Sequence, residues 1–227
     1  MLKKTLILLM LMAFTGSAVS QEKNKALVYT DFGGHTLYGF NMGLSGLYTR
    51  TLSDRWEVTG GLNFSSRRPA FFNAIMGDAT YRIPVKTFNV YLSGRMMYTY
   101  YSDSKMNDLL WRVAAKWESK YFDLVLGNSV VHTFSMGSSF TEWWVPSVGV
   151  FARLKPIHHP WNVGVHLRNY DDFFYENFNL NYGLNGYYNL NDQWGIMSEI
   201  TIAPAGTLSQ LATPYKFYIK LGATYKW

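Results

Sequence analysis

The stretch Phe217-Tyr-Ile-Lys-Leu-Gly-Ala-Thr-Tyr-Lys-Trp227 decides the fold, because its side chains alternate between two chemical types. The odd-numbered positions are apolar or aromatic, and the even-numbered positions are Tyr, Lys, Gly, Thr and Lys. Successive side chains of a β-strand point to opposite faces, so the pattern predicts a strand with one apolar and one polar face. The strand ends on an aromatic side chain, Trp227.

This ending resembles the closing strand of Gram-negative outer-membrane β-barrel proteins. In that superfamily the C-terminal aromatic residue is recognised by the barrel-assembly machinery. The resemblance therefore implies that Trp227 has this machinery as a partner, and that the protein contacts outer-membrane lipid and lipopolysaccharide. It also implies a location in the bacterial outer membrane with both termini on the periplasmic side. The resemblance is architectural and identifies no subfamily.

The start of the sequence agrees with this location. A basic Met1–Lys4 precedes an apolar Thr5–Phe14, and the small residues Ala18-Val-Ser20 follow. This order predicts a signal peptide over 1–20, cleaved before Gln21, and a single barrel domain over 21–227. The alternative is a buried N-terminal helix.

Composition separates a barrel from other classes. After the first twenty residues no segment approaches the roughly 18 consecutive apolar residues of a membrane helix, yet 18% of the chain is aromatic. A transmembrane barrel accounts for both, because only alternate residues face lipid. The net charge of +6 is scattered along the chain, so no nucleic-acid partner is expected. The lack of cysteine fits a periplasmic route without disulfides.

Alternation and turn residues predict about twelve strands, an even number as a single-chain bacterial barrel requires. They are expected at 25–33, 37–50, 56–66, 74–83, 87–101, 108–118, 121–133, 143–154, 161–170, 178–188, 194–203 and 215–227. The fold class is therefore all-β, an up-and-down antiparallel transmembrane barrel.

The predicted connections alternate between short and longer ones. The short ones are 51–55, 84–86, 119–120, 155–160 and 189–193, and the longer ones are 67–73, 102–107, 134–142, 171–177 and 204–214. Short turns belong on the periplasmic side of such barrels and longer loops outside. Pro146 falls within a strand, near its outer end, where a bulge is expected.

The aromatic residues support this orientation. Five tryptophans fall at the periplasmic ends of strands and point outward: Trp56, Trp117, Trp161, Trp194 and Trp227. Amphipathic rings prefer the membrane–water interface, so this set predicts an aromatic girdle. A soluble barrel with an aromatic core is the alternative, and it leaves the clustering at strand ends unexplained.

The opposite face of the strands is polar and is expected to line the lumen. Its charged members are Arg95, Arg112, Lys116, Arg153, Arg168, Lys220, Glu57, Asp78, Asp123 and Glu199. Facing lipid at the midplane would cost about 2–4 kcal/mol for each Arg or Lys, and this cost fixes the register.

Two functions follow from this interior. Barrels of about eight strands are filled by side chains and those of sixteen leave a channel, so twelve lies between. The first hypothesis is a narrow channel or binding barrel for a small polar solute, with a net-positive lumen that favours anions. The alternative is a structural or interaction barrel with a plugged lumen, which acts through its outer loops.

An enzymatic role is the third hypothesis. Barrels that resemble outer-membrane lipid hydrolases carry His-x-Ser on one strand, where a spacing of two places both groups on one face. This chain has His132-Thr-Phe-Ser135, and a spacing of three separates them unless a bulge brings Asn128, His132 and Ser135 together. No catalytic residue, metal site or cofactor is predicted.

Two outer loops are weak recognition candidates. Arg67–Phe72 combines cations and aromatics that suit lipopolysaccharide phosphates. Asp171–Glu176 combines anions and aromatics that suit calcium or a sugar.

Overall fold

The computed structural model describes residues 24–35, 39–65, 74–85, 87–101, 105–173, 180–204 and 214–227. The predicted signal peptide and the loop Arg67–Phe72 lie outside these residues. No helix within the described part of the chain is long and apolar enough to cross a membrane.

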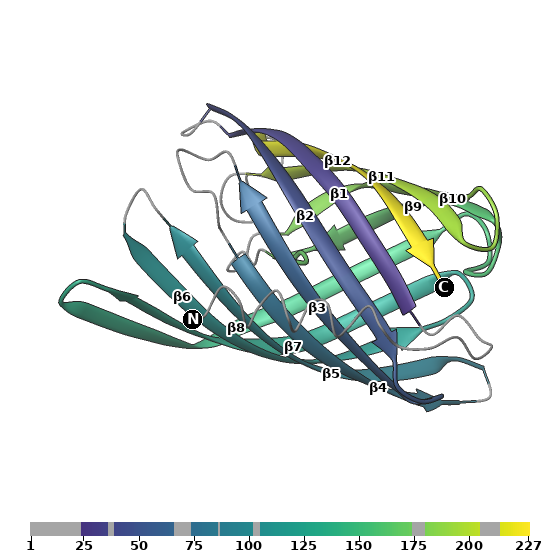
Figure 1. The fold of residues 1–227 in the computed structure, drawn as a ribbon, viewed down its shortest axis with the longest axis horizontal. Helices are drawn as coiled ribbons and strands as arrows, with labels where there is room; N and C mark the ends of the chain where they lie inside the picture. The colour runs from purple at the N-terminus through teal and green to yellow at the C-terminus, as the bar shows by residue number, and fades with distance from the viewer. Residues whose placement is uncertain are drawn as a thin grey trace.

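The described residues form one closed antiparallel barrel, in which each strand pairs with its sequence neighbours and the last strand returns to the first (Figure 1). The strands are β1 (Asn24–His35), β2 (Gly39–Thr51), β3 (Trp56–Ser65), β4 (Ala74–Pro84), β5 (Asn89–Tyr101), β6 (Met106–Glu118), β7 (Phe122–Ser135), β8 (Ser138–Arg153), β9 (Trp161–Arg168), β10 (Asn181–Asn189), β11 (Trp194–Pro204) and β12 (Pro214–Lys226). The predicted fold class and number of strands are confirmed.

The barrel is closed by its first and last strands. Lys25 lies opposite Lys226 in the register of β1 and β12, and the pairing continues to His35 and Lys216. Beyond the strand ends, the backbone N–H groups of Asn24 and Trp227 each donate to the other's carbonyl oxygen at 3.1 Å. Along this register, neither the first nor the last strand is left as an unpaired edge.

Burial alternates along each strand in the sense opposite to that of a soluble barrel. In β9, Trp161, Val163, Val165 and Leu167 are exposed, whereas the intervening Asn162, Gly164, His166 and Arg168 are buried. Exposed Val, Leu and Ile side chains recur on most other strands. This arrangement suits a barrel that is surrounded by acyl chains and polar inside.

The predicted aromatic side chains lie at the end of the barrel that carries the short connections. Two of the tryptophans pack against a tyrosine on the neighbouring strand, with ring centroids 4.9 Å apart for Trp56 and Tyr81 and 4.6 Å apart for Trp194 and Tyr225. Trp227 stacks on Tyr225 at 5.4 Å. The pairs form a band of amphipathic rings at one rim.

The hairpin of β7 and β8 differs from the prediction of a loop over 134–142. The strands continue to Ser135 and resume at Ser138, and Gly137 has a φ of 92°, which a glycine adopts without strain. The hairpin therefore projects beyond the other strands (Figure 1). The bulge expected near Pro146 is present, because the register shifts where Ser129 faces Val145 and Val131 faces Glu142.

Candidate functional site

The candidate site is the lumen, and charged side chains from facing strands meet there. On the wall made by β4 to β8, Arg95 Nε lies 2.9 Å from Asp78 Oδ2, and Lys116 Nζ lies 3.3 Å from Asp123 Oδ2. Arg153 also pairs with Asp123. Glu57, by contrast, is exposed near the short-turn rim. Eight of the ten predicted lumen charges lie in ion pairs, Arg112 is half-buried and Glu57 is exposed.

A second cluster, here called the central cluster, consists of Arg168, Asp171, Glu199 and Lys220. Arg168 Nη2 lies 2.5 Å from Glu199 Oε1 and 3.5 Å from Asp171 Oδ1. Lys220 pairs with Asp171 and lies 3.9 Å from Glu199 Oε1. The hydroxyl of Thr201 donates to Glu199 at 3.0 Å. All four charged side chains are buried, so their charges depend on one another for compensation.

Asp171 enters this cluster from a segment that leaves the barrel wall. Residues Asn169–Phe173, here called the inner segment, follow β9 and fold into the lumen. Asn169 fixes the turn, because its side chain accepts from Val148 N at 2.8 Å and donates to Pro146 O at 2.6 Å. Arg95 then donates to Asp172 O at 2.9 Å. Residues 171–173 belong to the predicted connection after β9, but they turn into the lumen and are not exposed as an outer loop would be; residues 174–176 lie outside the described part.

Phe173 anchors the inner segment in an apolar cluster inside the barrel. Only 2% of its surface is exposed. The other buried members are Tyr29, Ala74, Met76, Met97, Leu110, Val131 and Val145. Sequence reasoning treated the interior as polar and missed this cluster. The period-two pattern contained the information, because Met97 and Leu110 share a face with Arg95 and Arg112.

Tyr170 completes the inner segment between two strands. The guanidinium carbon of Arg112 lies 4.6 Å from the centre of its ring, a cation–π distance. On the opposite side the ring packs against Gly149, where an added Cβ would lie 2.7 Å from the hydroxyl oxygen. A glycine at 149 therefore makes room for the inner segment.

The charge of Asp171 is set by its neighbours. Burial alone would raise the pKa of this carboxyl, but Lys220 and Arg168 outweigh that effect and hold the pKa well below its ordinary value. Asp171 is therefore a carboxylate at neutral pH.

Two cavities lie on either side of the central cluster. The outer one, of about 40 Å³, is lined by Asp31, Asn41, Asn63, Ser65, Asp171, Lys216, Phe217, Tyr218 and Lys220. The inner one, of about 440 Å³, lies toward the short-turn end and has Glu199 in its lining. The side chains of Lys220 and Glu199 thus stand between the two spaces.

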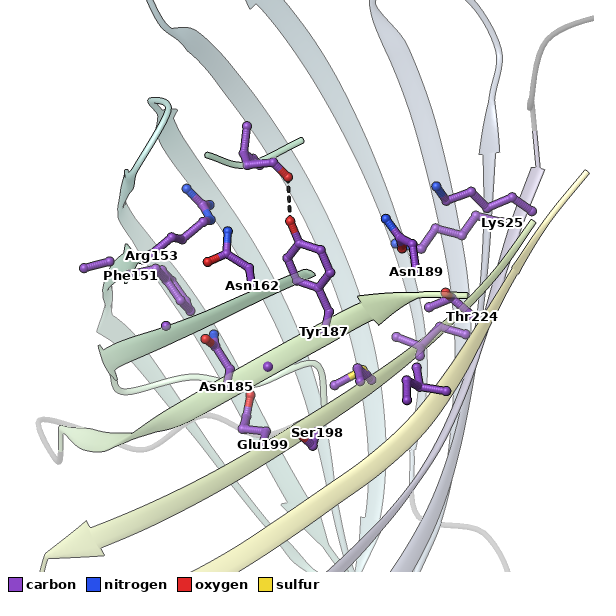
Figure 2. Close-up of a pocket in the computed structure, with 18 residues that line it drawn as sticks. Lys25, Phe151, Arg153, Asn162, Asn185, Tyr187, Asn189, Ser198, Glu199 and Thr224 are labelled. Atoms are coloured by element: carbon purple, nitrogen blue, oxygen red, sulfur yellow. Dashed lines mark hydrogen bonds between the residues drawn. The ribbon is translucent and has the colours of Figure 1, made fainter. Parts of the chain in front are cut away.

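Half of the residues that line the inner cavity carry amide, hydroxyl or cationic groups, and most of the others are apolar or glycine (Figure 2). Lys25, Asn189 and Thr224 lie on one side of Tyr187 in this view, and Arg153 and Asn162 lie on the other. The Tyr187 hydroxyl donates to Ile157 O at 2.7 Å and so holds its ring across the cavity. Glu199 is the one carboxylate among the described lining residues, against three cations, Lys25, Arg153 and Lys226.

The rim histidine does not assemble the hydrolase arrangement. β7 pairs one-to-one with β8 from Val131 to Ser135, so His132 and Ser135 stay on opposite faces. His132 Nδ1 lies 2.7 Å from Thr141 Oγ1, while Ser135 pairs with Ser138 at 3.1 Å and Asn128 donates to Trp143 O at 3.1 Å. Among the described residues, no group of three or more His, Asp or Glu side chains is arranged to hold a metal ion.

Comparison of the sequence with protein-family models and with curated proteins finds no match. The fold is similar to solved outer-membrane proteins. For an outer-membrane channel from Pseudomonas putida F1 the TM-score is 0.57 and the identity 10%, with 94% of this chain and 98% of that chain covered. The NanC porin gives a TM-score of 0.56 at 10% identity, with 89% and 100% covered. Omp33 of Acinetobacter baumannii gives 0.50 at 12%, with 91% and 98% covered.

Identities this low establish likeness of architecture and nothing about the solute. That likeness agrees with the strand count, the closed register and the outward apolar face. The protein therefore has the fold of the bacterial outer-membrane β-barrel proteins.

Proposed function

We propose that the protein is a narrow, closable passage for a small polar anion across the bacterial outer membrane. The short-turn rim, with both described chain ends, would face the periplasm, as in barrels of this type. The assembly machinery would recognise Trp227, and the outward apolar face would contact outer-membrane lipid and lipopolysaccharide.

One observation carries the proposal. The central cluster contributes Asp171 and Lys220 to the outer cavity and Glu199 to the inner one, and the inner cavity is lined by three cations and three amides against one carboxylate. A lumen of this composition lowers the energy of an anion and offers hydrogen bonds in place of its hydration shell. The route would run along the wall formed by β8 to β12 and β1, while most of the apolar cluster around Phe173 comes from β4 to β7.

Planar-bilayer recording tests the proposal. Single-channel steps are expected to be small and infrequent, and in a salt gradient the reversal potential should indicate anion preference. Lys25→Gln, which removes a cation from the inner cavity, should reduce that preference. Lys120→Gln removes the same charge from the turn after β6 and should leave the preference unchanged. Equal reversal potentials in all three proteins would contradict the proposed route.

The second candidate is a plugged barrel that acts through its outer surface. The β7–β8 hairpin favours it, because Met136, Phe140, Trp143 and Trp144 are between 65% and 93% exposed there. If no conductance steps appear in the wild type, nor in a Phe173→Ala variant with a loosened inner segment, the passage is excluded and this candidate remains.

A further inference from the structure

We infer that Arg168 and Lys220 form a carboxylate-binding site for the solute, and that Asp171 of the inner segment occupies this site while the passage is closed. The inference rests on the proposed function, and it names the chemical group by which the solute is recognised.

The two cations are fixed by strands, whereas Asp171 is not. Arg168 belongs to β9 and Lys220 to β12, while Asp171 lies in the non-strand inner segment. Of the strand-borne carboxylates, Glu199 pairs closely with Arg168, at 2.5 Å, and reaches Lys220 only at 3.9 Å. The strands alone therefore supply two buried cations and one close carboxylate. Withdrawal of the inner segment leaves a buried positive charge without compensation, which is costly unless another anion replaces it.

A further carboxylate, Asp31, does not fill this role. It is the register partner of Lys220 on β1, but its carboxylate lies against Gly43 of β2. Asp31 therefore interacts with Lys220 only through its charge, at longer range. The positive charge of Lys216, which lines the same outer cavity, offsets the negative charge of Asp31.

The site suits a monoanion with a planar head group. With Glu199 present, one additional negative charge neutralises Arg168 and Lys220, whereas a dianion would be repelled by Glu199. The Arg168 Nε–H is buried and has no acceptor among the described residues, so the guanidinium retains donor capacity. The centres of the Tyr29 and Tyr218 rings lie 4.9 Å and 5.7 Å from Lys220 Nζ, so the two rings limit the directions from which a solute can reach this ammonium group.

The position of the site links binding to opening. Lys220 lines the outer cavity and Glu199 the inner one, 3.9 Å apart, so a solute that crosses between the cavities at this point passes both side chains. Asp171 must then leave, together with the bonds that Arg95 and Tyr29 make to Asp172. A carboxylate that takes its place keeps the two cations compensated throughout the exchange.

Calorimetric titration of the purified barrel with D-gluconate tests the inference, with sorbitol as the neutral analogue and sorbitol 6-phosphate as the dianion. Asp171→Asn keeps the shape and removes the internal carboxylate. It should bind gluconate at least about tenfold more tightly than the wild type. In the wild type Asp171 occupies the site, and the apparent affinity falls in proportion to the fraction of molecules in which the site is vacant. Asp192→Asn, the same change at an exposed residue of the turn after β10, should match the wild type. The double variant Asp171→Asn/Lys220→Met, which loses both members of one ion pair, should not bind gluconate.

Three results would overturn the inference: equal gluconate affinity in Asp171→Asn and wild type, sorbitol binding as tight as gluconate, or undiminished binding by the double variant. If any of these occurs while the wild type still shows anion-selective conductance, the carboxylate site fails and the passage stands. If gluconate binding and conductance are absent from both the wild type and Asp171→Asn, both proposals fail.

Discussion

At the residue scale, the Glu199 side chain connects charged and polar groups of neighbouring parts of the lumen wall. Its Oε1 atom accepts from Arg168 at 2.5 Å and from the Thr201 hydroxyl at 3.0 Å. Thr201 Oγ1 in turn lies 3.1 Å from His166 Nε2. A buried ion pair of this kind adds little net stability by itself. Removing its carboxylate is nevertheless strongly destabilising, because a buried cation is left uncompensated.

Glu199→Gln is therefore expected to lower the free energy of unfolding. The loss should be roughly 3 kcal/mol, at the low end for a broken buried ion pair, because Asp171 remains as the second partner of Arg168. Urea unfolding in lipid vesicles, followed by tryptophan fluorescence, measures the change. Glu57→Gln, an identical substitution at an exposed lumen position, should change stability by less than about 0.5 kcal/mol. Equal effects of the two substitutions would argue against the central cluster.

At the scale of elements, the inner segment is held by contacts of two kinds. Asp171 and the Asp172 carbonyl bind cations of the wall, and Phe173 packs into the apolar cluster. Each is a long-range contact, made by a segment outside the regular sheet ladder. Its part from Asp171 onward can open without unfolding any strand, while Asn169 stays bound to β8 through the hydrogen bond from its N–H to Val148 O.

Phe173→Ala should loosen the inner segment, because removing a buried ring costs about 3–5 kcal/mol in a packed core. The chain has no cysteine, so a single cysteine at Asp172 can report the opening. Its labelling by a water-soluble maleimide should become at least several-fold faster. Phe140→Ala, at a ring 65% exposed on the β7–β8 hairpin, serves as the control and should leave the labelling rate unchanged. Labelling equally fast in both backgrounds would show that Phe173 does not anchor the segment.

At the scale of the whole molecule, the barrel is a sheet turned so that its apolar face meets lipid. Leu221 and Val163 are 50% and 48% exposed on that face, while Asn185 lines the inner cavity. An Arg or Lys on the lipid face costs about 2–4 kcal/mol at the midplane, and the same residue inside the lumen is solvated or paired.

Spin labels at Leu221 and Val163 in vesicles should relax with oxygen and be protected from a water-soluble nickel complex. A label at Asn185 should respond in the opposite way, because the inner cavity is polar. An aqueous response at Leu221 or Val163 would contradict the assignment of the outer face to lipid.

Trp227 takes part in barrel closure, and we propose that the assembly machinery also recognises it. Its backbone pairs with Asn24 and its ring stacks on Tyr225. We expect Trp227→Ser to reduce the amount of barrel assembled in cells more strongly than it reduces refolding of the urea-unfolded protein into vesicles. A parallel loss in the two assays would indicate a structural role alone.

Strand positions were predictable because period-two alternation is local: each residue's face follows from its neighbours in the chain. The β7–β8 hairpin was not, because the Met136–Gly137 turn is shorter than the polar composition of 134–142 suggested. His132 illustrates the same limit, since its partner Thr141 is set by the register between strands.

The sequence by itself determined the barrel, the lipid-facing side of every strand, the aromatic rim and the charged residues of the interior, since each depends on spacing along a single strand. Only the tertiary structure decided which charges pair, that Asp171 and Phe173 turn into the lumen, and that a cavity lies on either side of Lys220. These features join residues far apart in the chain, such as Asp171 and Lys220, and their geometry arises only when the sheet has closed.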